Sequence, residues 1–326
     1  MFVSPYHRGN KEQAEDIMYV KSCDAYKALQ HFRTHEFGEM LEVLPGVQVK
    51  FKVAGHILGS AIVEVFVNED GKTTKLVFTG DIGQPNQPII EDPEEISGAD
   101  FIISESTYGN RVHKAYDKEA ELSEIINDTV AKGGNVVIPA FAVGRTQEML
   151  YFIRQIKEEG RVKGHGNFKV YVDSPLANEA TTIFGEHRYD CFDEEAVALT
   201  RKGINPLSFP GLKTSVTSDD SRAINFDEDC KVIISASGMC DAGRIKHHLK
   251  HNLWRPECTI LFVGYQSVGT LGRALVEGAD EVNLFGETVS VRAEIRKMTG
   301  LSGHADKEGL IDWIRAFEEK PKKVFV

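Results

Sequence analysis

Two strings set the fold and the chemistry of this chain: Ala54-Gly55-His56-Ile57-Leu58-Gly59-Ser60-Ala61 and Thr79-Gly80-Asp81-Ile82-Gly83. Between them lie two β-rich runs, 61–67 and 73–78, around an Asp70-Gly71 pair. This pattern predicts a β-hairpin, which brings His56 and Asp81 to the same open end. A His and an Asp flanked by glycines, which let a ligand approach closely, fit a metal site. A surface His and a turn Asp in an ordinary hairpin remain the alternative.

The composition is ordinary for a soluble protein, and the chain is long enough for two domains. Of 326 residues, 41% are hydrophobic and no apolar run reaches the length of a membrane span. The five cysteines are scattered without a C-x-x-C spacing, which argues against a disulfide framework and favours the cytoplasm. The net charge of −11 does not favour non-specific attraction to nucleic acid.

Near-continuous apolar runs predict a parallel sheet covered by helices on both faces. The runs lie at 135–140, 168–172, 231–235 and 259–263, and an amphipathic helix is expected over 116–132. Ligands of such sheets bind beyond the carboxyl ends of the strands. Small and polar residues follow every run, so one shared cleft is expected there. Nearer the C-terminus, 289–295 alternates like a half-exposed strand, and a helix is expected after Asp306, through about Phe317.

Five further strings follow in order along the chain. They are Glu105-Ser106-Thr107-Tyr108-Gly109, 139–148 (Pro-Ala-Phe-Ala-Val-Gly-Arg-Thr-Gln-Glu), Val172-Asp173-Ser174-Pro175, Ser235-Ala236-Ser237-Gly238-Met239 and Ser302-Gly303-His304-Ala305-Asp306. With the strings around His56 and Asp81, they resemble motifs of the β-CASP branch of the metallo-β-lactamase fold. The resemblance implies an α/β fold: an incomplete metallo-β-lactamase αββα domain at 1–108 and 288–326, and an inserted β-CASP α/β domain, a parallel sheet flanked by helices, at 109–287.

The resemblance also implies a zinc-dependent phosphodiester hydrolase with two zinc ions. Asp81 would bridge the ions and His56 would bind one of them, while the metals offset the charge of the phosphate. His304 would protonate the leaving alkoxide, and Glu105 would orient the His304 ring. The string at Glu105 resembles the RNA-processing branch of the family more than the DNA-repair branch. RNA is therefore the expected substrate; endonuclease and 5′-exonuclease action stay open.

A second group of residues is expected to bind the RNA backbone. The Ser237-Gly238 turn precedes a helix expected to begin near Asp241, so backbone N–H groups there are suited to hold a phosphate. Arg244 and Arg145 would add positive charge. His247 and His251 share one helix face at i, i+4, but a phosphate contact or a solvated face is favoured over a metal site.

Other family motifs are missing from residues 1–326. The string H-x-H-x-D-H, which supplies four metal ligands in the family, does not occur, and no His follows the strand that Val324-Phe325-Val326 would open. His7, His31 and His35 are expected to be surface residues. Three explanations stay open: a fragment of a longer reading frame, which is favoured; a catalytically inactive RNA-binding or scaffold subunit; or half of a split enzyme completed by another chain. A homodimer is also possible, as among relatives. The joint presence of His56, Asp81, Glu105 and His304 favours a ribonuclease or a fragment of one.

Overall fold

The computed structural model describes residues 27–113 and 116–326 and divides the chain into two units, Met1–Glu39 and Met40–Val326. In the first unit, residues 27–39 are exposed apart from the partly buried Phe37. The prediction that His31 and His35 are surface residues is confirmed. His7 lies outside the described residues. Both large sheets belong to the second unit.

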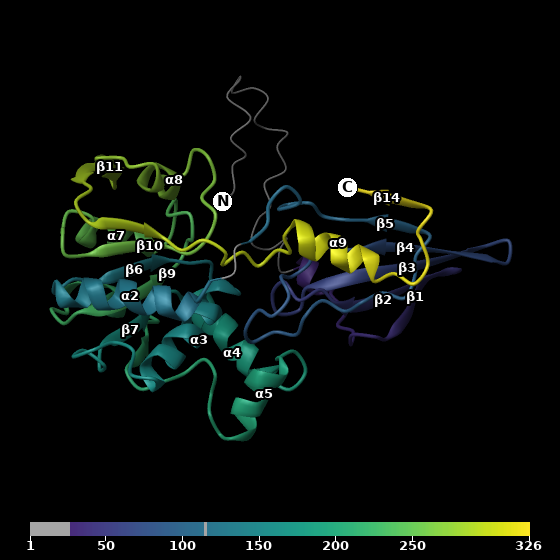
Figure 1. The fold of residues 1–326 in the computed structure, drawn as a ribbon, viewed down its shortest axis with the longest axis horizontal. Coiled ribbons are helices and arrows are strands. Elements are labelled where there is room, and N and C mark those ends of the chain that lie inside the picture. The colour runs from purple at the N-terminus through teal and green to yellow at the C-terminus, as the bar shows by residue number, and fades with distance from the viewer. Residues whose placement is uncertain (1–26, 114–115) are drawn as a thin grey trace. The chain divides into compact units, whose positions relative to one another are not determined.

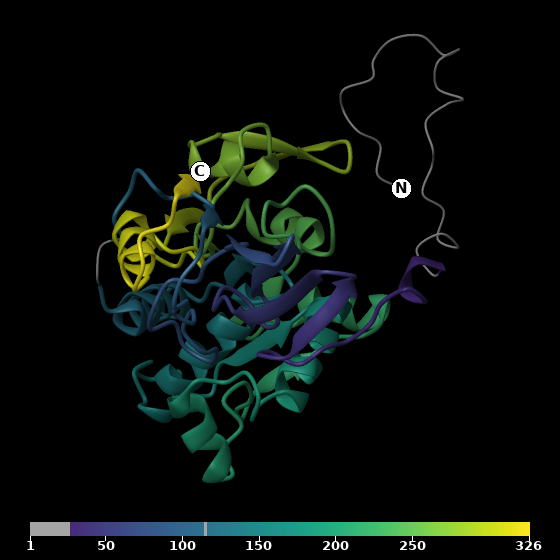
Figure 2. The ribbon, with the colours of Figure 1, turned by 90° about the vertical axis from the view of Figure 1, so that its right-hand side faces the viewer.

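The first sheet has six strands in the order β1-β2-β3-β4-β5-β14. Strands β1 (Met40–Leu44), β2 (Val47–Val53), β3 (Ala61–Glu69) and β4 (Lys72–Phe78) form an antiparallel ladder. The predicted hairpin is confirmed, because β3 and β4 pair from Val63↔Phe78 to Glu69↔Lys72. Strands β5 (Phe101–Ile103) and β14 (Lys323–Phe325) extend the sheet in parallel, although they are far apart in sequence (Figures 1 and 2).

One helix packs its apolar face on this first sheet. Helix α9 (Lys307–Arg315) begins at the cap Asp306, whose side chain accepts a hydrogen bond from the Gly309 N–H. Its Leu310 and Trp313 join a buried cluster with Ile62, Val77 and Ile102 from the strands. This packing fixes the segment just before α9, which contains His304, against the loops at the end of the sheet.

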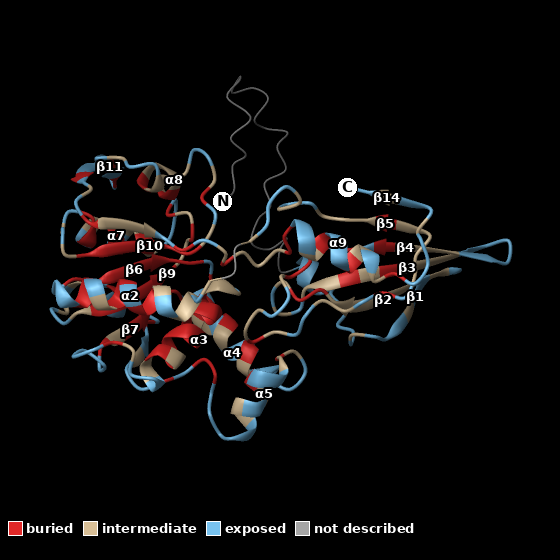
Figure 3. Cartoon of the chain, in the orientation of Figure 1, coloured by how far each residue is buried: buried red, intermediate tan, exposed pale blue. Residues whose placement is uncertain are grey.

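The second sheet is parallel throughout, as predicted, with the order β13-β10-β6-β9-β7-β8. Its central strands are completely buried (Figure 3), because helices cover both faces. The strands are β6 (Val136–Pro139), β7 (Lys169–Val172), β8 (Leu212–Thr214), β9 (Lys231–Ser235), β10 (Thr259–Phe262) and β13 (Glu294–Lys297).

Alternate residues of the parallel strands enter two separate cores. Val136 and Ile138 of β6 pack with helices on one face, and Val137 packs with helices on the other. The first face carries α2 (Lys118–Ala131), α3 (Arg145–Glu158), α4 (Pro175–Glu186) and α5 (Glu194–Arg201). The second carries α6 (Ser218–Phe226), α7 (Ile245–Asn252), α8 (Leu271–Val276) and the hairpin of β11 (Glu281–Leu284) and β12 (Glu287–Ser290).

Two local predictions were wrong. The helix expected near Asp241 begins at Ile245, because Gly243 adopts φ +85° and holds a turn against Ala236. The strand expected over 289–295 is two strands, the end of β12 and the start of β13. The chain breaks between them because the N–H groups of Arg292 and Ala293 both donate to the Leu253 carbonyl.

The chain leaves the first sheet after β5 and comes back to it after β13. Residue 288, the expected junction between the domains, falls within β12, and β13 still pairs with β10 of the parallel sheet. No helix in the part of the chain that the structure describes has both the length and the apolarity to cross a membrane.

Candidate metal centre

Three loops meet at the end of the first sheet. His56 lies between β2 and β3, Asp81 follows β4, and His304 precedes α9. Backbone hydrogen bonds tie the loops together: Gly83 N donates to Ala54 O at 2.7 Å, and Ala305 N donates to Ile82 O at 2.8 Å. The side chains are therefore positioned by main-chain contacts, one of which joins segments more than 200 residues apart.

The close approach of these loops depends on glycines that cannot carry a side chain. A Cβ at Gly83 would lie 1.8 Å from the carbonyl oxygen of Gly55, and one at Gly303 would lie 2.8 Å from Cε1 of the His56 ring. The glycines that flank the candidate ligands in the sequence are thus needed for loop packing, as well as for ligand approach.

Substitution of Gly83 tests this packing. Gly83→Ala is expected to lower the free energy of unfolding by about 1–3 kcal/mol, because the new methyl group overpacks backbone atoms that cannot move independently. Urea unfolding at equilibrium measures the change. Gly98→Ala is the matched control, since its added Cβ would meet nothing within 4 Å. Equal stability of the two variants would contradict the packing argument.

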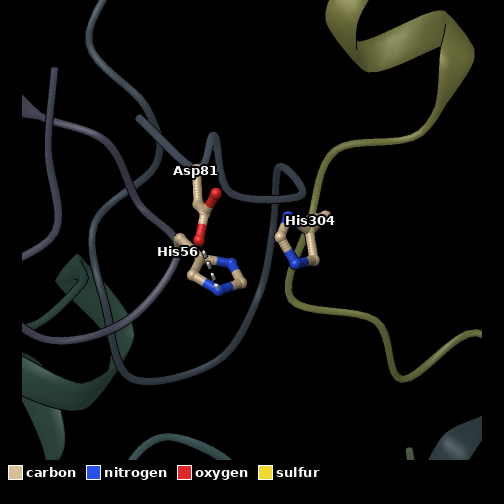
Figure 4. Close-up of side chains that lie close together, drawn as sticks. All are labelled: His56, Asp81 and His304. Carbon is tan, nitrogen blue, oxygen red and sulfur yellow. Dashed lines mark ion pairs between the residues drawn. The ribbon is translucent and has the colours of Figure 1, made fainter. Parts of the chain in front are cut away.

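His56, Asp81 and His304 form the one group of potential metal ligands found among the described residues. One ligand atom from each lies within 4.8 Å of the others, and the His56 Nε2 to Asp81 Oδ2 distance is 3.9 Å (Figure 4). Two ligand atoms that share a zinc ion at about 2.0–2.2 Å each lie no more than about 4.4 Å apart. The predicted convergence of His56 and Asp81 is confirmed.

The nitrogen atoms of the His56 ring lack hydrogen-bond partners among the described residues, as expected of a metal ligand. Its Nδ1 is buried without a hydrogen-bond partner, and its Nε2 lies beyond hydrogen-bond distance from Asp81. A buried polar atom without a partner costs free energy, which protein structures normally avoid. The imidazole and carboxylate donors fit a zinc ion by type and by separation, and they supply two of the three or four protein ligands that zinc sites use.

His304 is also held by a carboxylate, that of Glu105. Its Nδ1 lies 3.0 Å from Glu105 Oε2, and Glu105 also accepts a hydrogen bond from the Ile82 N–H. The hydrogen bond to Glu105 raises the pKa of His304 against the opposing effect of burial. Burial alone would raise the pKa of Glu105, but hydrogen bonds from His304 and Thr107 lower it. The pair therefore favours a protonated His304 imidazole, in which Nδ1–H is hydrogen-bonded to Glu105 and Nε2–H is free to donate a proton.

A series of ring contacts that runs from His304 through Tyr108 to His113 was missed by the sequence reasoning. The His304 ring lies 4.3 Å from the His56 ring and 6.0 Å from Tyr108, centroid to centroid, and His113 is 5.1 Å from Tyr108. The backbone N–H of His113 donates to Asp306 at 2.7 Å, and its Nε2 is buried without a partner. Tyr108 belongs to the string that begins at Glu105. Its position three residues after that carboxylate was the sequence signal that could have placed Tyr108 near His304.

The four expected phosphate contacts lie outside this cluster, at the parallel sheet. Ser237 Oγ accepts from the Ala242 N–H, and the Gly238 carbonyl accepts from Gln266 Nε2 at 3.0 Å. Arg145 pairs with Glu148, and Arg244 pairs with Asp173 at 2.8 Å. Both arginines already have carboxylate partners, which reduces the charge they offer to a phosphate.

Asp173 is the centre of a buried polar network that the sequence reasoning also missed. Its carboxylate accepts from His248 Nε2 at 2.6 Å, from Ser221 Oγ at 2.6 Å, and from the Ser215 hydroxyl. Burial would raise the pKa of Asp173, but these hydrogen bonds and that from Arg244 hold it well below its usual range. The network ties β7, α6 and α7 together.

His247 and His251, on either side of His248 in α7, contact aromatic rings. The His247 ring stacks on Phe285 at 4.5 Å between centroids, and the His251 ring lies 6.2 Å from Phe226. Neither belongs to the group of potential ligands found among the described residues.

The fold and this site define a class. A Beta-Casp domain model matches residues 146–275, and a Zn-dependent metallo-hydrolase RNA specificity domain model matches residues 288–326. The chain belongs to the β-CASP branch of the metallo-β-lactamase-fold ribonucleases.

Among its relatives, ribonuclease TTHA0252 of Thermus thermophilus is 37% identical over 93% of this chain and 67% of its own length. An RNase J-like protein of Methanocaldococcus jannaschii is 33% identical over 94% of this chain and 69% of its own. The transcription termination factor FttA of the same organism is 32% identical over 97% of this chain, which spans 50% of that relative.

Proposed function

We propose that this chain carries the catalytic centre of a zinc-dependent ribonuclease that hydrolyses RNA phosphodiesters. The observation that carries the proposal is the position of the His304–Glu105 pair beside His56 and Asp81. This arrangement places a proton donor next to two potential metal ligands. Two relatives are named as ribonucleases or RNase J-like, which supports RNA as the substrate. The scattered cysteines support a cytoplasmic location.

His56 and Asp81 would hold zinc. Zinc, when bound, supplies Lewis acidity toward the phosphate oxygens and toward water. His304 would donate a proton from Nε2 to the leaving oxygen of the RNA. Glu105 would hold the His304 ring by its Nδ1–H and stabilise the positive charge before that transfer.

The carboxyl ends of the parallel strands would position the RNA backbone. The Ser237–Gly238 loop offers small residues there, and Arg244 and Arg145 lie at the starts of α7 and α3. We further propose that the inserted domain extends from residue 109 to Lys297, because β13 belongs to the parallel sheet.

Asp81→Asn tests the metal assignment. The variant is expected to lose at least about tenfold in zinc affinity, and cleavage of labelled single-stranded RNA is expected to fall with it, because a neutral amide replaces the charged ligand. Competition with a chromogenic chelator measures the affinity. Asp70→Asn, in the turn at the other end of the same hairpin, is the control and should match the wild type. Unchanged zinc affinity in Asp81→Asn would refute the assignment.

An RNA-binding scaffold without catalysis is the second candidate. RNA binding by the zinc-loaded chain without cleavage would support the scaffold and refute the ribonuclease proposal.

A further inference from the structure

A cavity outside the metal centre has no role in the chemistry described above. It has a volume of about 1080 Å³ and lies where the loop 86–92, the start of α2, helix α3 and the segment 189–201 meet. An isolated bridge between Ile90 and Phe192 joins two of these walls, supported by the hydrogen bond from Asp193 N to Ile89 O at 2.9 Å. The walls are thus fixed by main-chain contacts.

The cavity is strongly acidic. Among the described residues that line it, two are basic, Lys118 and Arg201, and six are acidic: Glu91, Asp92, Glu119, Asp193, Glu194 and Glu195. Burial and the neighbouring carboxylates of Glu94 and Asp193 raise the pKa of Glu91. Burial also raises the pKa of Asp193, despite its hydrogen bonds to backbone N–H groups. The negative charges of these carboxylates outnumber the positive charges of the described residues around them. Such a site attracts positively charged ligands.

Aromatic rings form much of the remaining wall. Tyr116, Tyr151, Phe152, Tyr189 and Phe192 all line the cavity. The ammonium group of Lys118 already lies 5.8 Å from the centroid of the Phe152 ring. The chain itself therefore shows a cation on an aromatic face of this cavity. Carboxylates combined with aromatic faces are the surroundings that bind ammonium and guanidinium groups.

Side-chain amides also line the cavity. Asn86 and Gln87 lie in its wall, and Gln87 is held there by the hydrogen bond from its Nε2 to the Ser302 carbonyl at 2.8 Å. Side-chain amides suit the N–H and C=O groups of a peptide backbone.

We propose that this cavity binds an extended Lys- or Arg-bearing peptide segment of a protein partner. Its volume exceeds the 300–1,000 Å³ that is usual for small-molecule sites, so it fits several residues of chain better than a single amine. Its charge repels RNA. The proposal does not depend on the ribonuclease activity, and its test needs neither zinc nor RNA.

Fluorescence polarisation with a labelled hexalysine peptide tests the proposal. We expect saturable binding that weakens as salt rises, because the contact is between charges. Glu91→Gln combined with Glu194→Gln should weaken it about three- to thirtyfold, since two charge pairs are lost. Tyr189→Ala, which removes a half-exposed ring, should weaken it about two- to fivefold.

A second double variant separates the cavity from bulk charge. Glu69→Gln combined with Glu228→Gln removes two exposed acids that do not line the cavity, and it should leave the affinity unchanged. Equal weakening in both double variants, or no saturable binding at all, would overturn the proposal. Spermine binding as tightly as the peptide, with the same dependence on Glu91 and Glu194, would overturn the assignment to a peptide.

Discussion

His304→Ala is expected to reduce single-turnover RNA cleavage by about 10²–10⁴-fold, the usual contribution of a positioned general acid. The loss should come with unchanged zinc affinity, because His304 is assigned to proton donation and its Nδ1 is hydrogen-bonded to Glu105. Cleavage is measured with 5′-labelled single-stranded RNA at saturating enzyme. Zinc affinity is measured on the same preparation by chelator competition.

The combination of the two measurements decides the role of His304. The His304 ring lies near enough to His56 and Asp81 to be a third ligand, and in that case zinc affinity would fall along with cleavage. Glu105→Gln is the companion variant, since it keeps the side-chain shape and removes the negative charge that orients His304. We expect an intermediate loss of about 10–100-fold. Retained turnover in His304→Ala would refute the general-acid role.

Asp173→Asn is expected to lower the free energy of unfolding by about 3–5 kcal/mol, the usual cost of breaking a buried charged network on one side. The substitution leaves Arg244 and the buried His248 facing a neutral amide, and that amide can no longer accept all four hydrogen bonds. Equilibrium urea unfolding at pH 7 measures the change. Asp219→Asn, at an exposed ion pair on α6, is the control and should change stability by less than about 1 kcal/mol.

Acid titration gives this prediction a second readout. The pKa of Asp173 is lower in the folded protein than the unfolded value of about 3.9. Its stabilising contribution is therefore complete above that unfolded value and is lost as the pH falls toward the folded pKa. The wild type should lose stability more steeply below about pH 4 than Asp173→Asn does. Parallel pH profiles for the two proteins would contradict the network.

Local signals predicted the part of the site that one hairpin builds. The Asp70-Gly71 turn fixes the register of β3 and β4, and this register brings His56 and Asp81 together. The pairing of Glu105 with His304 was expected only from the family resemblance, because their contact depends on α9 packing against the first sheet. No turn or spacing signal reports such a contact.

Tertiary contacts explain what the sequence did not predict. The start of α7 is set by the turn at Gly243, where a Cβ would lie 2.4 Å from the Ala236 carbonyl oxygen. His248 lies on the buried face of α7, and its link to Asp173 depends on how that helix packs against the sheet, which helix periodicity alone does not give. The break between β12 and β13 likewise depends on the Leu253 carbonyl, nearly forty residues earlier in the chain.

Crystals of the chain soaked in zinc and measured at the zinc absorption edge test the central claim most directly. We predict an anomalous peak within about 2.0–2.2 Å of a His56 ring nitrogen and an Asp81 carboxylate oxygen, with His304 still hydrogen-bonded to Glu105 through Nδ1. A fully soaked crystal without a peak at this site, or with His304 directly coordinated to the metal, would contradict the account.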